Sequence, residues 1–455
     1  MRRITKRVYG LLALVIGFAC GLTALAGSLA AHGAKWAGSR ANAHVFSNGQ
    51  LVSAGGIYDR NGVALAASAG GERILPESKT TRMATLHAVG DPQGFISAGV
   101  QSVFRAKLIG WSAWNGMYPL VRYGRGSDVL LNLDAELCAT AYKALNGHKG
   151  TVAVMDYRTG ELLCMVSAPS FDPLHKPENM EGDEKYDAIY MNRFLHGLFT
   201  PGSVFKIVTA AAAIENIPDI HTQVFTCTGK YATGEGYVIC SGTHGKIHFE
   251  QAMNNSCNAA FAAIAEQLGE QKLRAMAEQL GFSRQYAIDG IPLSPSRFSG
   301  GGMNVLELGW AGIGQHTTLA NPAHFLMLMS AVANGGEGAV PRLVAGIRSP
   351  GGFVAAYGRK ESGVRLSAAT ARQLVELLRS NVQNKYDSDG SEDAMQLCGK
   401  TGTAEVNGKK PHAWFAGFSA NPQTPYSIVI VAENGGSGQG VAYDIAAKVM
   451  RAVCG

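Results

Sequence analysis

Three short motifs carry side chains that could together form a serine acyl-transfer site. In chain order they are Ser203-Val-Phe-Lys206, Ser256-Cys-Asn258 and Lys400-Thr-Gly-Thr403. Each is weak alone, because Ser-x-x-Lys is expected by chance in a chain of 455 residues. The three in one order predict a serine nucleophile that is activated by a lysine in place of a histidine.

The first motif follows a chain break at Pro201-Gly202 and opens an apolar, alanine-rich run of helical composition. Ser203 should therefore lie near a helix N-terminus, where backbone N–H groups favour a developing negative charge. Lys206 should project from the same face one turn later. Its flanks, Phe205 and Ile207, disfavour the ammonium form, as a general base requires. An N-cap serine with a surface lysine is the alternative that these flanks disfavour.

The second motif lies in an expected turn between two segments of helical composition. Ser256 could relay a proton to a leaving amine, and Asn258 could bond a substrate amide. A helix-capping cluster is the simpler interpretation of this motif on its own. Cys257, between the two, is interpreted as a small filler residue.

The third motif is typical of a strand edge, along which an extended peptide could add as a further strand. Gly402 would let the substrate backbone approach closely. Lys400 and the hydroxyls of Thr401 and Thr403 would hold a terminal carboxylate. The N–H groups of Thr403 and Ser203 could form an oxyanion hole. A plain hairpin would explain the glycine but not the lysine.

These motifs resemble those of the penicillin-binding proteins, specifically the monofunctional class B D,D-transpeptidases of bacterial cell-wall synthesis. Further similar blocks cover most of residues 126–455, among them Gly126–Asp134, Gly150–Asp156, Ser167–Pro173 and His412–Gly417. The resemblance implies an α/β (α+β) transpeptidase fold like that of the serine beta-lactamases, with a central antiparallel sheet flanked by helices.

The resemblance also implies roles for the motif residues. The serine at 203 is acylated by the penultimate D-Ala of a peptidoglycan stem peptide, and beta-lactams acylate the same serine. The expected catalytic residues are Ser203, Lys206, Ser256, Asn258 and Lys400, and the expected substrate-binding residues are Thr401, Gly402 and Thr403. Two positions depart from the family pattern, Ala54 in place of an arginine and His316 where glycine is more frequent.

Hydrophobic patterns predict the elements of this domain. Strands are expected at 151–156, 162–167, 413–419 and 426–433, joined by short turns that imply antiparallel pairing. Helices are expected at 135–145, 206–214, 259–268, 322–333, 369–382 and 443–453. The glycine-rich stretch 435–440 is interpreted as a flexible connector.

The amino terminus predicts a membrane anchor. Residues 1–7 carry four basic side chains and form an expected cytoplasmic tail, and the uncharged residues 8–31 would span about 36 Å as a helix. This charge pattern predicts one membrane pass with the catalytic domain outside the cytoplasm. A cleaved signal peptide, with a site near Ala24-Leu-Ala26, is the alternative.

Residues 32–125 are interpreted as a small pedestal domain, with a strand near Gln50–Ser53 and a turn at Asp59–Gly62. The pedestal is too short for the glycosyltransferase domain of class A relatives. The resemblance therefore implies a partner that polymerises glycan strands, a membrane glycosyltransferase of the SEDS type.

Charge and cysteine usage narrow the remaining functions. The net charge of +6 falls to +2 without the basic tail, so nucleic-acid binding is not expected. Cys227 and Cys240 bracket a hairpin-like insert and form either a disulfide or two reduced thiols. A zinc site of these two with His244 and His248 lacks a standard ligand spacing, so no metal and no cofactor are expected.

Two other functions remain open. A beta-lactamase or D,D-carboxypeptidase would need a base for a deacylating water, and the motifs offer no clear one. A penicillin-binding sensor or silent scaffold could dispense with Lys206 and Lys400, yet both are present.

Overall fold

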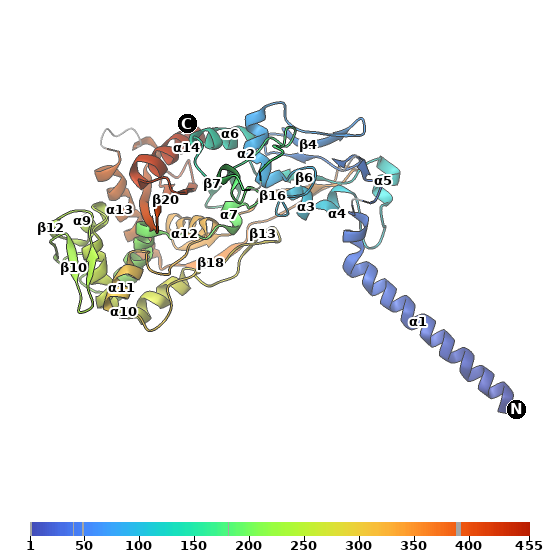
Figure 1. The fold of residues 1–455 in the computed structure, drawn as a ribbon, viewed down its shortest axis with the longest axis horizontal. Helices are drawn as coiled ribbons and strands as arrows, with labels where there is room; N and C mark the ends of the chain where they lie inside the picture. Colours follow the sequence, from blue (N-terminus) through green and yellow to red (C-terminus); the bar gives the residue numbers. More distant parts are fainter. Residues whose placement is uncertain (1, 40, 48–49, 181, 388–392) are drawn as a thin grey trace.

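The computed structural model describes residues 2–39, 41–47, 50–180, 182–387 and 393–455. The molecule is elongated: helix α1 (Arg2–Ala37) projects from one end, a small strand-rich unit follows, and a larger α/β unit forms the other end (Figure 1). Within the described chain, α1 is the one helix long and apolar enough to cross a membrane, with a mean hydropathy of 2.2 in its most apolar part. The predicted span, 8–31, lies wholly within α1.

The strand-rich unit beside α1 is built on a six-stranded sheet of order β17-β16-β6-β3-β4-β5. The predicted turn at Asp59–Gly62 joins the first two strands of this sheet in chain order, and the Asp59 carboxylate accepts N–H bonds from Asn61 and Val63. The strands of this sheet are β3 (Ile57–Tyr58), β4 (Ala64–Ala69), β5 (Glu72–Ile74), β6 (Asp128–Leu131), β16 (Val344–Arg348) and β17 (Val354–Ala356).

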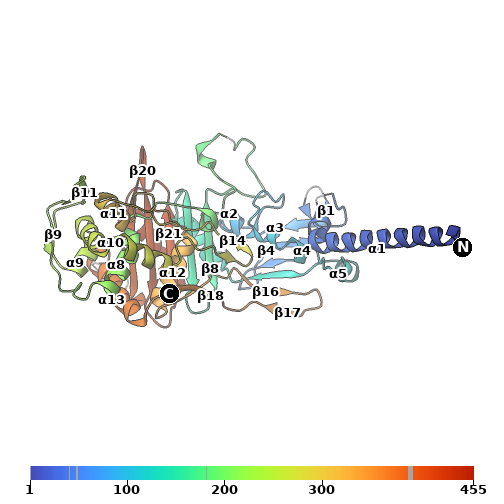
Figure 2. The same ribbon diagram turned by 90° about the horizontal axis from the view of Figure 1, so that it is seen from below.

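Figure 2 shows the β16–β17 hairpin and α5 near the end of α1 that joins the rest of the molecule. Strands from both sides of residue 125 therefore pack in one sheet, while the division of the chain at that residue stays a prediction. The unit also holds β1 (Phe46–Ser47), β2 (Gln50–Leu51), α2 (Lys79–Val89), α3 (Val100–Val103), α4 (Arg105–Leu108) and α5 (Tyr118–Tyr123).

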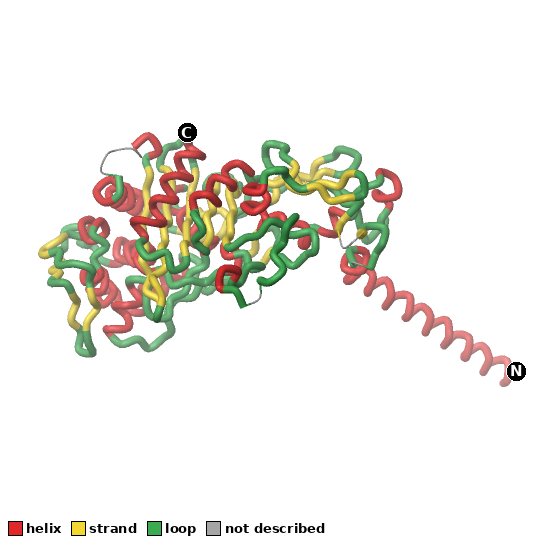
Figure 3. Tube along the Cα trace, turned by 45° about the horizontal axis from the view of Figure 1, so that its top comes forward, coloured by secondary structure: helices red, strands yellow, loops and turns green. Residues whose placement is uncertain are grey.

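The larger unit is organised around a five-stranded antiparallel sheet of order β19-β20-β21-β7-β8, with β19 at one edge. Helices cover both faces of this sheet (Figure 3). The strands are β7 (Gly150–Asp156), β8 (Leu162–Ala168), β19 (Leu397–Val406), β20 (Lys409–Ser419) and β21 (Tyr426–Ala432). The four predicted strands are confirmed, and the Lys-Thr-Gly motif supplies the fifth.

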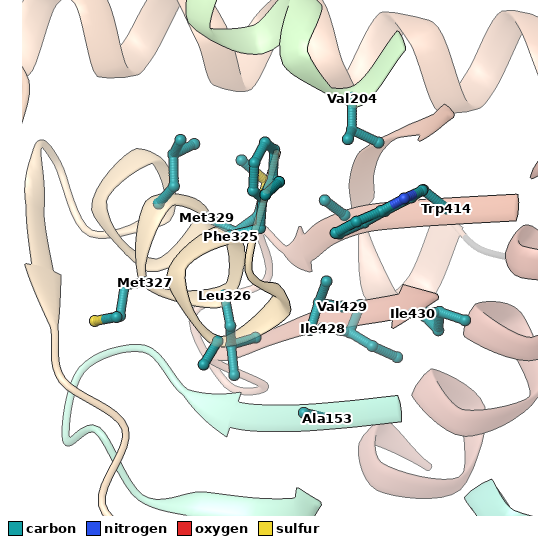
Figure 4. Close-up of a cluster of buried hydrophobic side chains, with 14 of the residues drawn as sticks. Ala153, Val204, Phe325, Leu326, Met327, Met329, Trp414, Ile428, Val429 and Ile430 are labelled. Carbon is teal, nitrogen blue, oxygen red and sulfur yellow. The ribbon is translucent and has the colours of Figure 1, made fainter. Parts of the chain in front are cut away.

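One helix, α12 (Pro322–Ala333), closes the core over the sheet. Figure 4 shows Phe325 and Leu326 of this helix directed at Trp414, Ile428 and neighbouring strand residues. All of these side chains are buried. Nearly every residue of α12 is apolar, which fits a helix that is enclosed on all sides.

The remaining helices form the opposite face and the subdomain beyond β19, and capping residues fix where several of them begin. Asp134, Asn304, Asn321 and Ser367 each accept a backbone N–H bond at the start of α6, α11, α12 and α13. These helices are α6 (Ala135–Ala144), α7 (Arg193–His196), α8 (Lys206–Asn216), α9 (Phe249–Asn254), α10 (Asn258–Gln279), α11 (Val305–Gly312), α13 (Ala368–Lys385) and α14 (Asp444–Cys454).

Short elements complete this unit. They are the short strands β9 (Phe225–Cys227), β10 (Lys230–Ala232), β11 (Tyr237–Ile239), β12 (Gly245–Ile247), β13 (Ala287–Ile288), β14 (Ile291–Pro292), β15 (Glu337–Ala339) and β18 (Glu361–Arg365), and the short helical turns η1 (Glu184–Tyr186), η2 (Gly202–Phe205), η3 (Asp393–Met395) and η4 (Gly438–Tyr443). The six predicted helices are confirmed. The helix predicted at 259–268 ends at a kink, where Gly269 has a φ of 71°.

Candidate active site

Lys206 is the centre of the candidate site. Its Nζ atom lies 3.1 Å from Ser203 Oγ, 3.1 Å from Ser256 Oγ, 2.6 Å from the Ser256 carbonyl oxygen and 2.7 Å from Asn258 Oδ1. The lysine is the first residue of α8, and Ser203 lies in η2 directly before it. The first two predicted motifs therefore meet at one nitrogen.

The environment of Lys206 favours the neutral amine. The side chain is completely buried, and this burial, followed by the neighbouring charge of Lys400, holds the pKa of Lys206 well below its ordinary value of 10.5. A neutral amine offers two N–H groups and one lone pair. The Ser256 carbonyl and Asn258 Oδ1 accept the two N–H bonds, so the lone pair is left for a hydroxyl proton.

The turn between α9 and α10 brings Ser256 and Asn258 to this lysine. Ser256 has a φ of 50°, an uncommon conformation for a residue other than glycine, and it turns its carbonyl toward Nζ. Asn258 is the first residue of α10, and its side-chain nitrogen Nδ2 donates to the Ile239 carbonyl at 2.9 Å. The side chain of Asn258 thus positions Lys206, a role that the second motif alone did not reveal.

Glycines let η2 and the edge strand β19 lie in direct contact. A Cβ on Gly202, whose φ is 55°, would stand 2.9 Å from the Thr403 carbonyl oxygen. A Cβ on Gly402 would stand 2.7 Å from the Pro201 carbonyl oxygen. The missing side chain of Gly402 therefore admits the nucleophile loop of the protein itself, and the approach of a substrate backbone at Gly402 stays a prediction.

The stretch 435–440, interpreted from the sequence as a flexible connector, packs instead against the edge strand β19. Gly438 opens the turn η4, and its N–H donates to Thr403 Oγ1 at 3.1 Å. A Cβ on Gly438 would stand 2.4 Å from the Gly402 carbonyl oxygen. Gly438 therefore allows close packing against β19, and this stretch is not a free linker.

Lys400 lies behind the cleft surface. It is completely buried, and burial, followed by the charge of Lys385, lowers its pKa to about 7. Its Nζ is 3.3 Å from the carbonyl oxygen of Thr401. The charge of Lys400 acts on Lys206 from this position, and its predicted contact with a substrate carboxylate stays a prediction.

The motifs open into one cleft of about 600 Å³. Among the described residues that line the cleft, Ser203, Ser256, Asn258, Thr401 and Thr403 come from the predicted set, whereas Lys206, Lys400 and Gly402 do not reach its surface. A nucleophile at the wall of a cleft bounded by an open strand edge suits an extended peptide substrate.

The sequence matches the family model of the penicillin-binding protein transpeptidase domain over residues 150–451. The chain belongs to this family. The recognition of class B penicillin-binding proteins is thereby confirmed, as is the predicted enzyme class, a serine-type transpeptidase.

Curated relatives agree with this membership. Peptidoglycan D,D-transpeptidase PbpA of Mycolicibacterium smegmatis is 28% identical over 341 residues, which cover 69% of this chain and 68% of that protein. Peptidoglycan D,D-transpeptidase MrdA of Acinetobacter baumannii is 26% identical, with 70% of this chain and 52% of that protein covered. This chain thus spans about half the length of the second relative.

Solved structures agree in fold. Penicillin-binding protein A of M. tuberculosis, in its ceftriaxone acyl-enzyme complex, superposes with a TM-score of 0.80 at 22% identity, over 89% of this chain and 99% of that one. Pseudomonas aeruginosa PBP2 gives a TM-score of 0.72 at 26% identity, over 88% and 96% of the two chains. The predicted fold class is confirmed.

Several residues of this transpeptidase cleft were not found from the sequence. The Tyr386 hydroxyl lies 2.7 Å from Thr401 Oγ1, at the end of α13. Glu405 and Gln439 also line the cleft. Both Tyr386 and Gln439 lie outside the three motifs, and no local pattern marks either as a cleft residue.

Of the two outcomes predicted for Cys227 and Cys240, the structure shows the reduced thiols. All eight are free thiols in the structure, so Cys227 and Cys240 are not joined. His248, offered as a possible zinc ligand, has its Nδ1 3.1 Å from the Gln223 carbonyl oxygen. Cys257 instead lies beside Cys240, with their sulfurs 3.8 Å apart, and is more than a filler residue.

Proposed function

We propose that this transpeptidase cross-links peptidoglycan stem peptides through an ester on Ser203, and that beta-lactams acylate the same oxygen. The contact of 3.1 Å between the buried amine of Lys206 and Ser203 Oγ carries the proposal. Among the residues that the structure describes, those that hydrogen-bond this amine include no histidine, which supports the lysine as the base.

In the first step the Lys206 lone pair takes the Ser203 proton while the serine oxygen attacks the carbonyl of the penultimate D-Ala. The backbone N–H groups of Ser203 and Thr403 would hold the oxyanion. Ser256, which also contacts Lys206, would pass the proton to the departing D-Ala amine. The products are free D-Ala and a peptidyl ester.

In the second step the amine of a neighbouring stem peptide attacks this ester. Lys206, through the Ser256 hydroxyl, would take the proton from the amine and return it to Ser203 Oγ. The Thr401 and Thr403 hydroxyls on the open edge of β19 would align the donor peptide by its carboxylate. A beta-lactam follows the first step alone, because its leaving nitrogen stays tethered.

A fluorescent penicillin tests this proposal on the full-length chain in detergent. The wild type should be labelled, and so should a Ser102→Ala control, which is altered in the strand-rich unit beside α1. Ser203→Ala should not be labelled. A wild type that resists labelling would contradict the assignment. Rapid turnover of a chromogenic cephalosporin by the wild type would favour a hydrolase instead.

We also propose that α1 stays attached as a single-pass anchor with the transpeptidase unit outside the cytoplasm. The basic residues that precede its apolar stretch support this orientation. Protease added to intact spheroplasts should degrade everything beyond α1, and a mature chain that begins near Gly27 would refute the anchor.

A membrane glycosyltransferase of the SEDS type is the proposed partner. Large apolar side chains on the unit nearest α1 support a protein contact there: Trp114, Val121 and Phe353 are 95%, 85% and 74% exposed. Trp114→Glu should reduce co-purification with such a polymerase, whereas Tyr237→Glu, at the opposite end of the molecule, should not. Equal co-purification of both variants would refute this surface.

A further inference from the structure

Three cysteines and one histidine converge beside the Ser256–Asn258 turn. They are Cys227 at the end of β9, Cys240 just after β11, His244 just before β12, and Cys257, which caps α10. One ligand atom from each lies within 4.8 Å of all the others. We propose that these four residues bind one Zn²⁺ ion through three thiolates and His244 Nδ1.

Three distances between ligand atoms of the cluster match those of a tetrahedral zinc site. With Zn–S bonds of about 2.3 Å and a Zn–N bond of about 2.05 Å, an ideal tetrahedron separates two sulfurs by about 3.8 Å and a sulfur from a nitrogen by about 3.6 Å. Cys240 Sγ and Cys257 Sγ are 3.8 Å apart. The Nδ1 of His244 is 3.5 Å from Cys227 Sγ and 3.6 Å from Cys240 Sγ.

The surroundings of the sulfurs suit thiolate ligands. All three cysteines are buried, and two accept bonds from backbone N–H groups: Cys240 Sγ from Asn258 at 3.3 Å and Cys257 Sγ from Ala260 at 3.4 Å. Such N–H bonds stabilise negative sulfur and orient it toward a metal. Soft sulfur with one imidazole at tetrahedral spacing selects zinc among the common divalent ions.

A disulfide is the competing outcome, since the proposed location outside the cytoplasm is oxidising. Three cysteines can form one disulfide at most, which would leave a third buried thiol and the histidine without a role. The bond would also require two sulfurs to move from 3.8 Å to about 2.0 Å. A zinc ion would bind all four side chains at their present positions.

The metal would hold the second catalytic motif in place. Cys257 lies between Ser256 and Asn258, and the Asn258 N–H bonds the sulfur of another ligand, Cys240. A bound ion would therefore tie the two hairpins of residues 225–247 to the turn whose carbonyl and amide oxygens bind Lys206. This kinetic consequence rests on the proposed function, whereas metal binding itself does not.

Metal content of the full-length chain in detergent tests the site directly. The wild type should contain one zinc per chain by plasma mass spectrometry. After chelation it should take up one Co²⁺ and show visible d–d bands with near-ultraviolet thiolate-to-cobalt absorption. Cys227→Ser and His244→Ala should lose the metal, while the matched controls Cys138→Ala and His248→Ala should keep it.

A second measurement separates this proposal from the proposed function. Zinc removal should lower the rate of acylation by fluorescent penicillin about ten- to a hundredfold, with recovery when Zn²⁺ is returned. A wild type without zinc, unable to take up Co²⁺, or with a disulfide among these cysteines by peptide mapping, would overturn the metal site. A zinc-loaded chain that fails to react with penicillin would instead refute only the transpeptidase proposal.

Discussion

The Gly402→Ala substitution tests whether the edge strand positions the nucleophile by direct contact. The new methyl group would stand 2.7 Å from the Pro201 carbonyl oxygen and 3.2 Å from Trp414 Cβ. Ordinary contacts begin near 3.5 Å, so the Pro201 carbonyl must retreat by roughly 0.8 Å. Pro201 is two residues before Ser203, and the displacement should therefore reach the reactive hydroxyl.

This displacement should have two measurable effects. Overpacking of this kind costs about 1–3 kcal/mol, so the thermal midpoint should fall by a few degrees. A misplacement near 1 Å at a reacting group costs on the order of a hundredfold in rate, so acylation by fluorescent penicillin should slow by about that factor. Stopped-flow labelling and differential scanning fluorimetry on the same preparation measure both effects.

A matched control exists at Gly358, where an added Cβ meets nothing within 4 Å. Gly358→Ala should melt and acylate like the wild type. A Gly402→Ala variant with an unchanged midpoint would refute the packing argument. If acylation then still fell, Gly402 would serve the approach of substrate after all.

Three further predictions concern the charges and hydroxyls of the site. Lys206→Met should keep the fold but slow acylation about 10²–10⁴-fold, as loss of a general base requires, measured by the same labelling. Burial, followed by the charge of Lys385, lowers the pKa of Lys400 from 10.5 to about 7. Between pH values of about 7 and 10.5, the unfolded chain therefore binds a proton at Lys400 that the folded chain lacks. The free energy of unfolding should rise with pH across that interval. Thermal denaturation of Lys400→Met should show a flatter rise, and an unchanged profile would contradict the burial of this amine. Tyr386→Phe removes the hydrogen-bond partner of the Thr401 hydroxyl. Loss of one hydrogen bond worth about 1 kcal/mol should slow acylation about fivefold and leave the pH profile of acylation unchanged.

The sequence predicted the parts of this enzyme that depend on local pattern. The apolar run after Pro201-Gly202 and the break at Ser256-Cys257 gave the correct helix ends, and turn residues gave the antiparallel pairs. Ser203, Lys206, Ser256 and Asn258 were predicted together because each motif keeps its own spacing.

What the sequence did not predict depends on packing between distant segments. Spacing suggested His248 as a metal ligand, but the hairpin directs it to Gln223, and Cys257 reaches the cluster from the start of a helix. Likewise β16 and β17 join the sheet beside the anchor although more than two hundred residues separate them from β6. Such pairings follow from the tertiary fold and leave no periodic signal.

The nucleophile loop, β19 and the Ser256 turn are each supported by a different contact on the side away from the cleft. The Trp414 indole donates to the Thr200 carbonyl at 3.0 Å behind the nucleophile loop, and Asn381 donates to the Gly399 carbonyl at 2.6 Å behind β19. The cysteine–histidine cluster stands behind the Ser256 turn. The hydrogen bonds of Lys206 in the described chain go to the nucleophile loop and to the Ser256 turn, so the relative position of these two segments decides whether its lone pair faces Ser203. Loss of the support under the Ser256 turn should therefore resemble loss of the base in its effect on acylation, whereas loss of the Asn381 contact should chiefly weaken alignment of the donor peptide on β19.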